Sequence, residues 1–367
     1  MMINMSVRDI LVKLSEITSP SSNEEMMRQY IMSNFGAMVD KFSTDAHGNL
    51  FLMKCGRNKV KKTLMIVAHM DDIGIIVTYI EENGLARFDK IGGLDVNTLI
   101  GQRVNLLTSH GIIQGVIGAV PPHVKKENGQ KTEISDLWID IGATNKHETS
   151  TILSIGDVGV MKYEFSELLG NRVTLSAADN KVGITILMSA LSNLRVKELD
   201  NLDIIYIATS QEEIGLRGAS ALCQEYQPDY AIVLDVTHSS DYPGIKKAIY
   251  GDVKLGNGPV IPISADSSKV LQSFIRGIAT RNRIPHQIQA FARPTGTDLN
   301  AIQLRQQHTL TGLICVPCRY MHSPNEVVSI KDIEDALDIL TRSIEELNSV
   351  ILDEPNAYCP IGTIPEE

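Results

Sequence analysis

Cysteine is scarce in this sequence, and acidic residues outnumber basic ones. The 367 residues include five cysteines, a scattered odd number that excludes a disulfide framework and is typical of a reducing compartment. There are 34 lysines and arginines against 44 aspartates and glutamates, which gives a formal net charge of −10. Nucleic-acid-binding proteins usually present a basic face, so we expect no nucleic-acid partner.

Long apolar runs are missing as well. No stretch of the sequence approaches the ~20 apolar residues that a membrane-spanning helix needs. The N-terminus has neither the basic start nor the apolar core of a signal peptide. We therefore expect a cytoplasmic protein without a membrane partner. The sequence also has no P-loop, no G-x-S-x-G motif and no complete dinucleotide-binding fingerprint, which argues against phosphoryl transfer, serine hydrolysis and dinucleotide binding.

Two of the cysteines, Cys315 and Cys318, form a C-x-x-C pair. A zinc site of this kind normally needs a second pair, and a redox pair normally stands at the start of a helix. Here the pair lies in an apolar run over residues 312–318, which is typical of a strand. We expect both thiols to pack in the core.

The apolar residues that are present predict an α/β fold. They make up 43% of the chain, against 21% charged residues, which is typical of a globular protein with a substantial core. Short apolar runs predict buried strands at residues 63–68, 202–209, 230–236 and 312–316. Helical patterns alternate with them, and the clearest begins after Ser329. Alternating strands and helices indicate a mostly parallel sheet covered on both faces.

The middle of the chain has a different pattern. Between about residues 74 and 159 the apolar runs are short, β-branched and separated by glycines, and no long helical pattern interrupts them. This pattern predicts a compact β-barrel-like module inserted into the α/β domain. We expect residues 71–163 to form the inserted domain, and residues 1–70 with 164–367 to form a discontinuous, helix-covered parallel-sheet domain.

Polar residues follow the predicted strands, at the sheet edge where open α/β folds bind ligands. His69 follows the first run, and Asp71 stands two residues later, where a carboxylate could orient the imidazole of a metal-binding histidine. Asp179 closes another run and opens a helix. Each residue also has an ordinary interpretation, because a lone histidine is more often structural and Asp179 could simply cap its helix.

Three further segments repeat the pattern. Glu212 and Glu213 follow the run at residues 202–209, Asp235 interrupts an apolar strand, and His322 follows the last strand. A solvated turn would explain the adjacent glutamates, but a buried carboxylate needs a partner, and a cation is one such partner.

Together these segments supply two histidines and three carboxylates as candidate metal ligands, with one further glutamate left over. The five are His69, Asp179, Glu213, Asp235 and His322. Imidazole and carboxylate ligands without thiolates are typical of zinc, cobalt or manganese. Three ligands for each of two ions, with one shared, would leave an open position on each ion for water, which is a catalytic arrangement.

Four segments closely resemble the M42 family of metallo-aminopeptidases, which includes glutamyl and tetrahedral (TET) aminopeptidases and proteins described as endoglucanases. They are AHMDDIG at residues 68–74, ADNK at 178–181, QEEIGLRGA at 211–219 and RYMHSP at 319–324. The resemblance runs in order over nearly the whole chain, and the string at 211–219 is its most specific part. It implies a dinuclear metallopeptidase domain with an inserted β module.

The resemblance also implies roles for the candidate residues. His69 and Asp235 would bind one metal, Glu213 and His322 the other, and Asp179 would bridge the two. Among the residues that bind no metal, Glu212 would be the general base and Asp71 would orient His69. Two divalent ions per subunit are implied, with zinc ahead of cobalt or manganese.

The implied function is an aminopeptidase that acts on short peptides, often as a homo-oligomer of twelve subunits. One alternative is a metal-dependent deacylase or amidase acting on N-acyl amino acids, which blocked and free-amine substrates would distinguish. Another is a catalytically dead assembly protein, for which we would expect lost ligands. The sequence departs from the family pattern at Asp72, where glutamate is usual, at Lys181, often arginine, and at Leu299, usually alanine.

Overall fold

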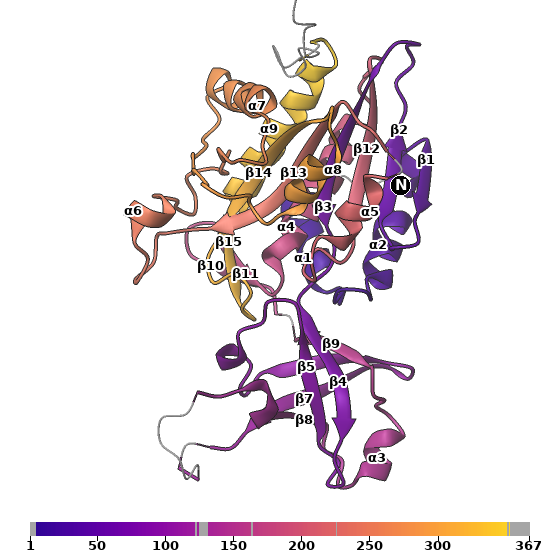
Figure 1. Cartoon of the computed structure of the whole chain (residues 1–367), viewed down its shortest axis with the longest axis vertical. Coiled ribbons are helices and arrows are strands. Elements are labelled where there is room, and N and C mark those ends of the chain that lie inside the picture. Colours follow the sequence, from indigo (N-terminus) through magenta and orange to yellow (C-terminus); the bar gives the residue numbers. More distant parts are fainter. Residues whose placement is uncertain are drawn as a thin grey trace, which may run out of the picture.

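The structure is a computed structural model that describes residues 5–121, 123–124, 131–162, 164–224, 226–350 and 352. These residues form a central sheet with helices on both faces and, below it in Figure 1, a closed β-barrel. In this part of the chain, no helix is both long enough and apolar enough to cross a membrane.

The central sheet has six strands in the order β1-β2-β12-β3-β13-β14. The last four are parallel, while β1 and β2 add an antiparallel edge beside β12. The parallel strands are buried on both faces, which explains their continuous apolar runs. The strand bounds are β1 Lys41–Thr44, β2 Leu50–Lys54, β3 Lys62–His69, β12 Leu202–Thr209, β13 Tyr230–His238 and β14 Leu310–Cys318.

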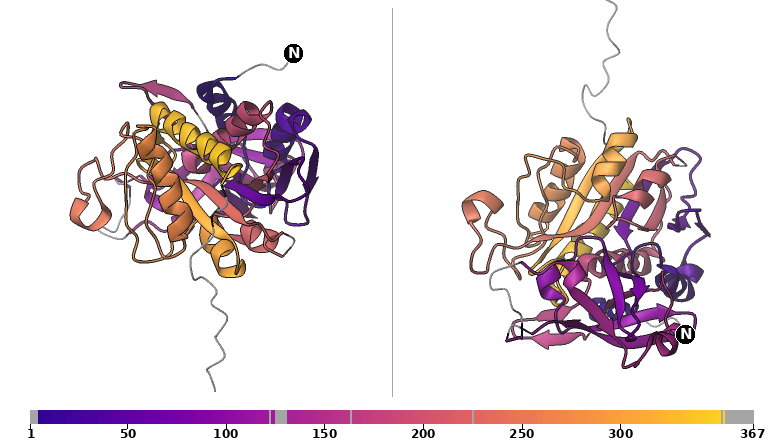
Figure 2. Two further views of the ribbon diagram at one scale, coloured as in Figure 1. Left: turned by 90° about the horizontal axis from the view of Figure 1, so that it is seen from above. Right: turned by 60° about the horizontal axis from the view of Figure 1, so that its bottom comes forward.

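Seven helices pack on the two faces of the sheet in the described residues. One core joins a face of the sheet to α1 Val7–Ser15, α2 Glu25–Phe35, α4 Ala178–Leu194, α7 Lys269–Arg281 and α9 Ile330–Leu347. A second core joins the opposite face to α5 Arg217–Leu222 and α8 Asp298–Arg305. Figure 2 shows α9 in yellow beside α7 in orange, and the two helices contact each other.

The C-terminal helix begins where its sequence predicts. The Ser329 side chain accepts a hydrogen bond from the backbone N–H of Asp332, which satisfies one of the free donors of the first turn. Ile333, Leu340 and Ile344 are fully buried and form the apolar stripe that packs on the core. Shorter elements complete this part of the chain: η1 Gly36–Met38, α6 Lys247–Tyr250, and an antiparallel sheet of β10 Ser166–Leu168, β11 Arg172–Leu175 and β15 Glu326–Ser329.

The inserted module is a closed barrel with strand order β4-β5-β8-β7-β6-β9 and its own apolar core. Its elements are β4 Gly74–Ile80, β5 Ala86–Ile91, η2 Val96–Thr98, β6 Arg103–Thr108, β7 Gly111–Ala119, η3 Ile134–Asp136, β8 Leu137–Asp140, α3 Lys146–Ser150 and β9 Val158–Met161. The predicted fold class is therefore confirmed. We keep residues 71–163 as the proposed bounds of the inserted domain. Cys315 and Cys318 both lie buried in β14, as predicted.

Candidate metal centre

Parallel strands bring four of the five candidate metal ligands to one edge of the central sheet, and helix α4 brings the fifth. Because β12, β3, β13 and β14 run in the same direction, their carboxyl ends lie side by side. His69 is the last residue of β3, Asp235 lies near the end of β13, and Glu213 and His322 follow β12 and β14. Asp179 lies at the start of α4, which packs against β3 and β13.

Asp179 lies between the two histidines. Its Oδ1 is 3.0 Å from Nε2 of His69, and its Oδ2 is 3.3 Å from Nε2 of His322. Asp235 adds a carboxylate oxygen 3.9 Å from His69 Nε2, and Glu213 adds one 3.4 Å from His322 Nε2. Two groups of three ligands therefore share one aspartate, and within each group the ligand atoms lie within 4.8 Å of one another.

The two histidines are strongly affected by these carboxylates. Hydrogen bonds with Asp179 and Glu213 raise the pKa of His322 to about 11. Burial alone would lower the pKa of His69, but the charge of Glu212 and the hydrogen bond with Asp179 outweigh it and raise that pKa well above its usual value. Without a metal, the His322 imidazole is therefore a cation at neutral pH.

The carboxylates differ in what surrounds them. Burial raises the pKa of Asp235 well above its usual value, and burial also raises the pKa of Glu213. Burial acts in the same direction on Asp179, but His322 and His69 outweigh it and hold its pKa well below the usual range. Oε1 of Glu213 is buried, and it faces Nε2 of His322 at 3.4 Å.

This donor set fits divalent metal ions. Several buried carboxylates face each other with only two imidazoles to offset their charge, which is costly unless cations neutralise them. Imidazole and carboxylate donors are those that zinc, cobalt and manganese accept. The thiol of Cys315 lines the same cavity but belongs to neither ligand group.

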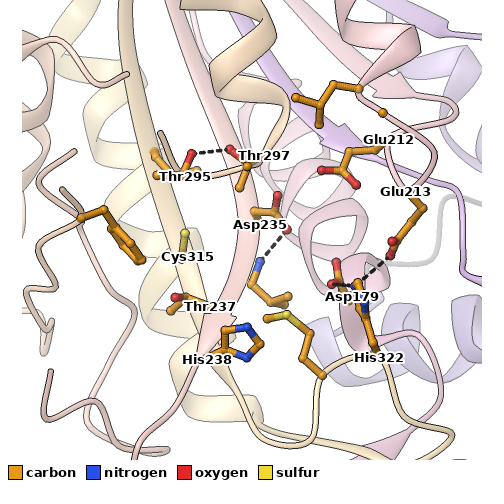
Figure 3. Close-up of a pocket in the computed structure, with 17 residues that line it drawn as sticks. Asp179, Glu212, Glu213, Asp235, Thr237, His238, Thr295, Thr297, Cys315 and His322 are labelled. Atoms are coloured by element: carbon orange, nitrogen blue, oxygen red, sulfur yellow. Dashed lines mark hydrogen bonds and ion pairs between the residues drawn. The ribbon is translucent and has the colours of Figure 1, made fainter. Parts of the chain in front are cut away.

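Glu212 lies beside the candidate ligands. Its Oε2 is 4.0 Å from Nε2 of His69, and the side chain is 11% exposed. With His69 and Glu213 it forms a further group of donors close enough to hold an ion, so geometry alone allows it to be a ligand or a base. Figure 3 shows Glu212, Glu213, Asp235, Asp179 and His322 around one cavity. The volume of this cavity is about 350 Å³.

Asp71 holds the loop that carries the two glutamates. Its carboxylate accepts hydrogen bonds from the backbone N–H of Glu212 at 2.9 Å and of Glu213 at 3.2 Å. Nδ1 of His69 lies 3.1 Å from the backbone carbonyl oxygen of Asp71 and 3.6 Å from its carboxylate. Asp71 thus contacts the backbone of both glutamates as well as the imidazole that it was expected to orient.

Ser21 is a contact that sequence reasoning missed. Its hydroxyl donates a 2.6 Å hydrogen bond to the Asp71 carboxylate, and both side chains are buried. The two residues are 50 positions apart, and no local motif announces the contact. Nearby, the Glu24 carboxylate accepts a hydrogen bond from the backbone N–H of Gln211, so the N-terminal segment supports the loop at two points.

We expect Ser21→Ala to lower both stability and turnover. Losing a buried hydrogen bond to a charged group should reduce the free energy of unfolding by about 1.5–3 kcal/mol. Because Asp71 positions the glutamate loop, kcat should also fall, by roughly 10-fold. Chemical denaturation and steady-state kinetics would measure the two effects.

Ser19→Ala is the matched control. Ser19 donates the same kind of bond, at 3.0 Å, to Asp72, whereas the backbone N–H groups of Glu212 and Glu213 donate to Asp71. It should lose comparable stability and keep kcat. Equal effects of both substitutions on kcat would contradict a specific positioning role for Ser21.

Two of the departures from the family pattern contact each other. Lys181 Nζ lies 3.1 Å from Asp72 Oδ2, and both side chains are 1% exposed. Ser19 donates hydrogen bonds to Asp72, and Lys181 donates one to the backbone carbonyl of Ile17. The third departure, Leu299, is buried in α8. None of the three lines the cavity.

Comparison with known proteins gives one consistent family. The family described as M42 glutamyl aminopeptidase matches residues 48–339. A putative aminopeptidase from Acetivibrio thermocellus is 36% identical over 92% of this chain and 98% of its own length. The lysyl aminopeptidase of Pyrococcus furiosus is 31% identical over 92% of this chain and 97% of its own.

Solved structures agree with these relatives. Aminopeptidase APDkam598 from the archaeon Desulfurococcus kamchatkensis has a TM-score of 0.86 at 35% identity, over 93% of this chain and 94% of its own. The Pyrococcus horikoshii TET1 peptidase, which can assemble into a tetrahedron or a large octahedral shell, has a TM-score of 0.82 at 35% identity, over 92% and 98%. The chain belongs to the M42 family of aminopeptidases and is a peptidase hydrolase.

Proposed function

We propose that this chain removes N-terminal residues from short peptides, using a dinuclear metal centre and Glu212 as general base. The observation that carries the proposal is the pair of ligand groups that share Asp179, next to Glu212 and open to one cavity. A structural zinc site would be closed by four protein ligands, whereas each group here offers three.

We propose a role for each ligand. His69 and Asp235 would hold one ion, Glu213 and His322 the other, and Asp179 both. When bound, two such ions polarise the scissile carbonyl and lower the pKa of a water molecule towards neutrality. We propose zinc as the natural ion, with cobalt and manganese as functional substitutes.

Glu212 would move the proton. Burial raises the pKa of its carboxyl well above the usual value, and a base works best when its pKa lies near the working pH. Its carboxylate would accept a proton from the attacking water and deliver it to the nitrogen of the leaving amine. Asp71 would keep the Glu212 backbone in place through the N–H that it binds.

The preference for a free amine follows the relatives, which are described as aminopeptidases. The proposed ligands and Glu212 place four carboxylates around the metal-binding end of the cavity, and two divalent ions would offset their charge. By analogy with the TET1 assemblies, we propose that the chain forms a homo-oligomer of twelve subunits. We also propose that it acts in the cytoplasm.

Paired substrates test this function directly. Leucine p-nitroanilide and its N-acetyl derivative differ only in the free amine, and a site that binds a polar group discriminates against the analogue without it by on the order of 10⁴-fold. We expect the metal-loaded protein to cleave only the free-amine member at a useful rate. Cleavage of the blocked member alone would reject the aminopeptidase and favour an amidase acting on N-acyl amino acids.

A further inference from the structure

The cavity extends beyond the metal centre into a pocket with uncharged walls. Figure 3 shows Thr237, Thr295, Thr297 and Cys315 on the side away from His322. With Phe291 and Leu313, which also line the cavity, they form what we call the neutral pocket. Leu313 and Cys315 are buried, while Phe291 and the two threonines of the loop are partly exposed.

Strand geometry makes this pocket continuous with the metal centre. Asp235 in β13 pairs with Cys315 in β14. Side chains two residues apart on a strand point to the same face, so Thr237 lies beside Asp235 and Leu313 beside Cys315. Phe291, Thr295 and Thr297 of the loop over residues 291–297 also line the pocket. A group bound at the proposed metal ligands therefore lies next to these walls.

Among the described residues, no cationic side chain lines the neutral pocket. Apart from the proposed ligands and Glu212, the titratable groups that these residues contribute to the cavity lining are Cys315 and His238. Burial raises the pKa of the Cys315 thiol and lowers the pKa of His238, so both are uncharged at neutral pH. The nearby loop residue Arg293 is exposed and does not line the cavity.

An acidic residue lies behind the pocket wall. The Asp266 carboxylate accepts hydrogen bonds from the backbone N–H of Thr295 at 2.8 Å and from its hydroxyl at 2.7 Å. Asp266 is buried, and its second carboxylate oxygen accepts no hydrogen bond from the described residues. Its position makes the pocket still less favourable for a negative charge.

We propose that the neutral pocket receives the side chain of the substrate's N-terminal residue, accepting uncharged side chains such as leucine and methionine and rejecting glutamate and aspartate. This inference rests on the proposed function. The side chain of the first residue stems from the carbon between the amine and the scissile carbonyl. When those two groups occupy the metal centre, the side chain must enter the adjoining cavity.

The physical reason for rejection is desolvation. A glutamate side chain in this pocket would leave water without gaining a cation from the described residues, which is strongly unfavourable. The hydroxyls of the three threonines are already engaged, Thr237 with Gln289, Thr295 with Asp266, and Thr297 with Thr295. A leucine side chain would instead contact Leu313, Cys315 and Phe291 and leave no charge unpaired. We expect the ratio of kcat/KM values for leucine over glutamate to be on the order of 10²–10³.

A panel of aminoacyl p-nitroanilides carrying leucine, methionine, glutamate or lysine tests the selectivity of the zinc-loaded protein. Leucine and methionine should give the highest kcat/KM values. A kcat/KM value for the glutamate substrate equal to that for the leucine substrate would overturn the inference and leave the aminopeptidase assignment intact. A kcat/KM value for the lysine substrate above that for leucine would also overturn it, because Asp266 would then be acting as a counter-ion. Cleavage of none of the four would instead defeat the proposed function.

Phe291→Arg tests the place of the pocket. The new cation should raise the ratio of kcat/KM for glutamate over leucine by roughly 10-fold or more, because it pairs with the substrate's carboxylate. Phe291 is partly exposed and lies outside the packed cores, so the substitution spares the fold. Phe42→Arg, on the opposite edge strand β1, is the matched control and should leave the ratio unchanged. An unchanged ratio in folded Phe291→Arg would show that the side chain binds elsewhere.

Discussion

Replacing Glu212 by glutamine should lower kcat by roughly 10²–10⁴-fold, the usual contribution of a general base. The change is isosteric and removes the negative charge together with the ability to accept a proton. Because Glu212 stands outside the two groups that share Asp179, the variant should still bind close to two metal ions per chain. Elemental analysis of the purified protein and steady-state kinetics on the same sample would measure both quantities.

Glu213→Gln provides the matched comparison at the next residue. Glu213 belongs to the group with Asp179 and His322, so its loss should reduce bound metal together with turnover. Metal loss in Glu212→Gln as well would make Glu212 a ligand, which its closeness to His69 and Glu213 also allows. Turnover near that of the unsubstituted protein in Glu212→Gln would show that another group is the base.

The pH profile gives a second check on Glu212. A base must be unprotonated to act, so kcat/KM of the unsubstituted protein should fall as the pH decreases through the pKa of Glu212. Burial raises that pKa in the metal-free protein, and bound cations would shift it downward again. The acidic decline that belongs to this group should be absent from the residual activity of Glu212→Gln.

The sequence was informative wherever the signal was local. The buried strands are continuous apolar runs, the last helix has its cap at Ser329 and its stripe of apolar residues, and each candidate ligand stands next to the end of a strand or the start of a helix. Because the ends of parallel strands meet at one edge, recognising those runs was enough to predict that His69, Asp235 and His322 lie together.

Contacts between distant segments could not be predicted in the same way. The hydroxyl of Ser21 meets Asp71 across 50 positions, and Lys181 pairs with Asp72 in the core. The residues around Ser21 and Lys181 form no motif that identifies the distant partner. The walls of the neutral pocket come from three segments that only the folded chain brings together, so selectivity was beyond the sequence.

Removing the metals should abolish turnover and destabilise the protein, more at alkaline than at acidic pH. In the metal-free centre the pKa of His322 is raised to about 11. A histidine with a raised pKa contributes stability that is complete below its unfolded value of about 6.5 and is lost as the pH rises towards the folded value. Asp235 and Glu213 are buried, and their pKa values are also raised. Their contributions to the stability of the metal-free protein therefore also fall as the pH rises.

Bound metals stabilise the protein more as the pH rises, because they replace the protons at these ligands and bind more tightly at higher pH. At a free metal concentration 100 times the dissociation constant, stabilisation is about 2.7 kcal/mol. The gap in Tm between zinc-loaded and EDTA-treated protein should therefore widen from pH 6 to pH 8, as thermal unfolding of both forms in matched buffers would show. A gap that is constant or narrows would contradict the ligand assignment.

Substituting each of two histidines that line the same cavity tests which of them is a metal ligand. His322→Gln removes a proposed ligand and should reduce both the gap in Tm and its growth with pH. His238 lines the cavity but belongs to no ligand group, and burial lowers its pKa instead of raising it. His238→Gln should thus keep the full pH-dependent gap. If it lost the gap and His322→Gln kept it, the second ion would bind at His238, and the cavity would have to be reassigned around that residue.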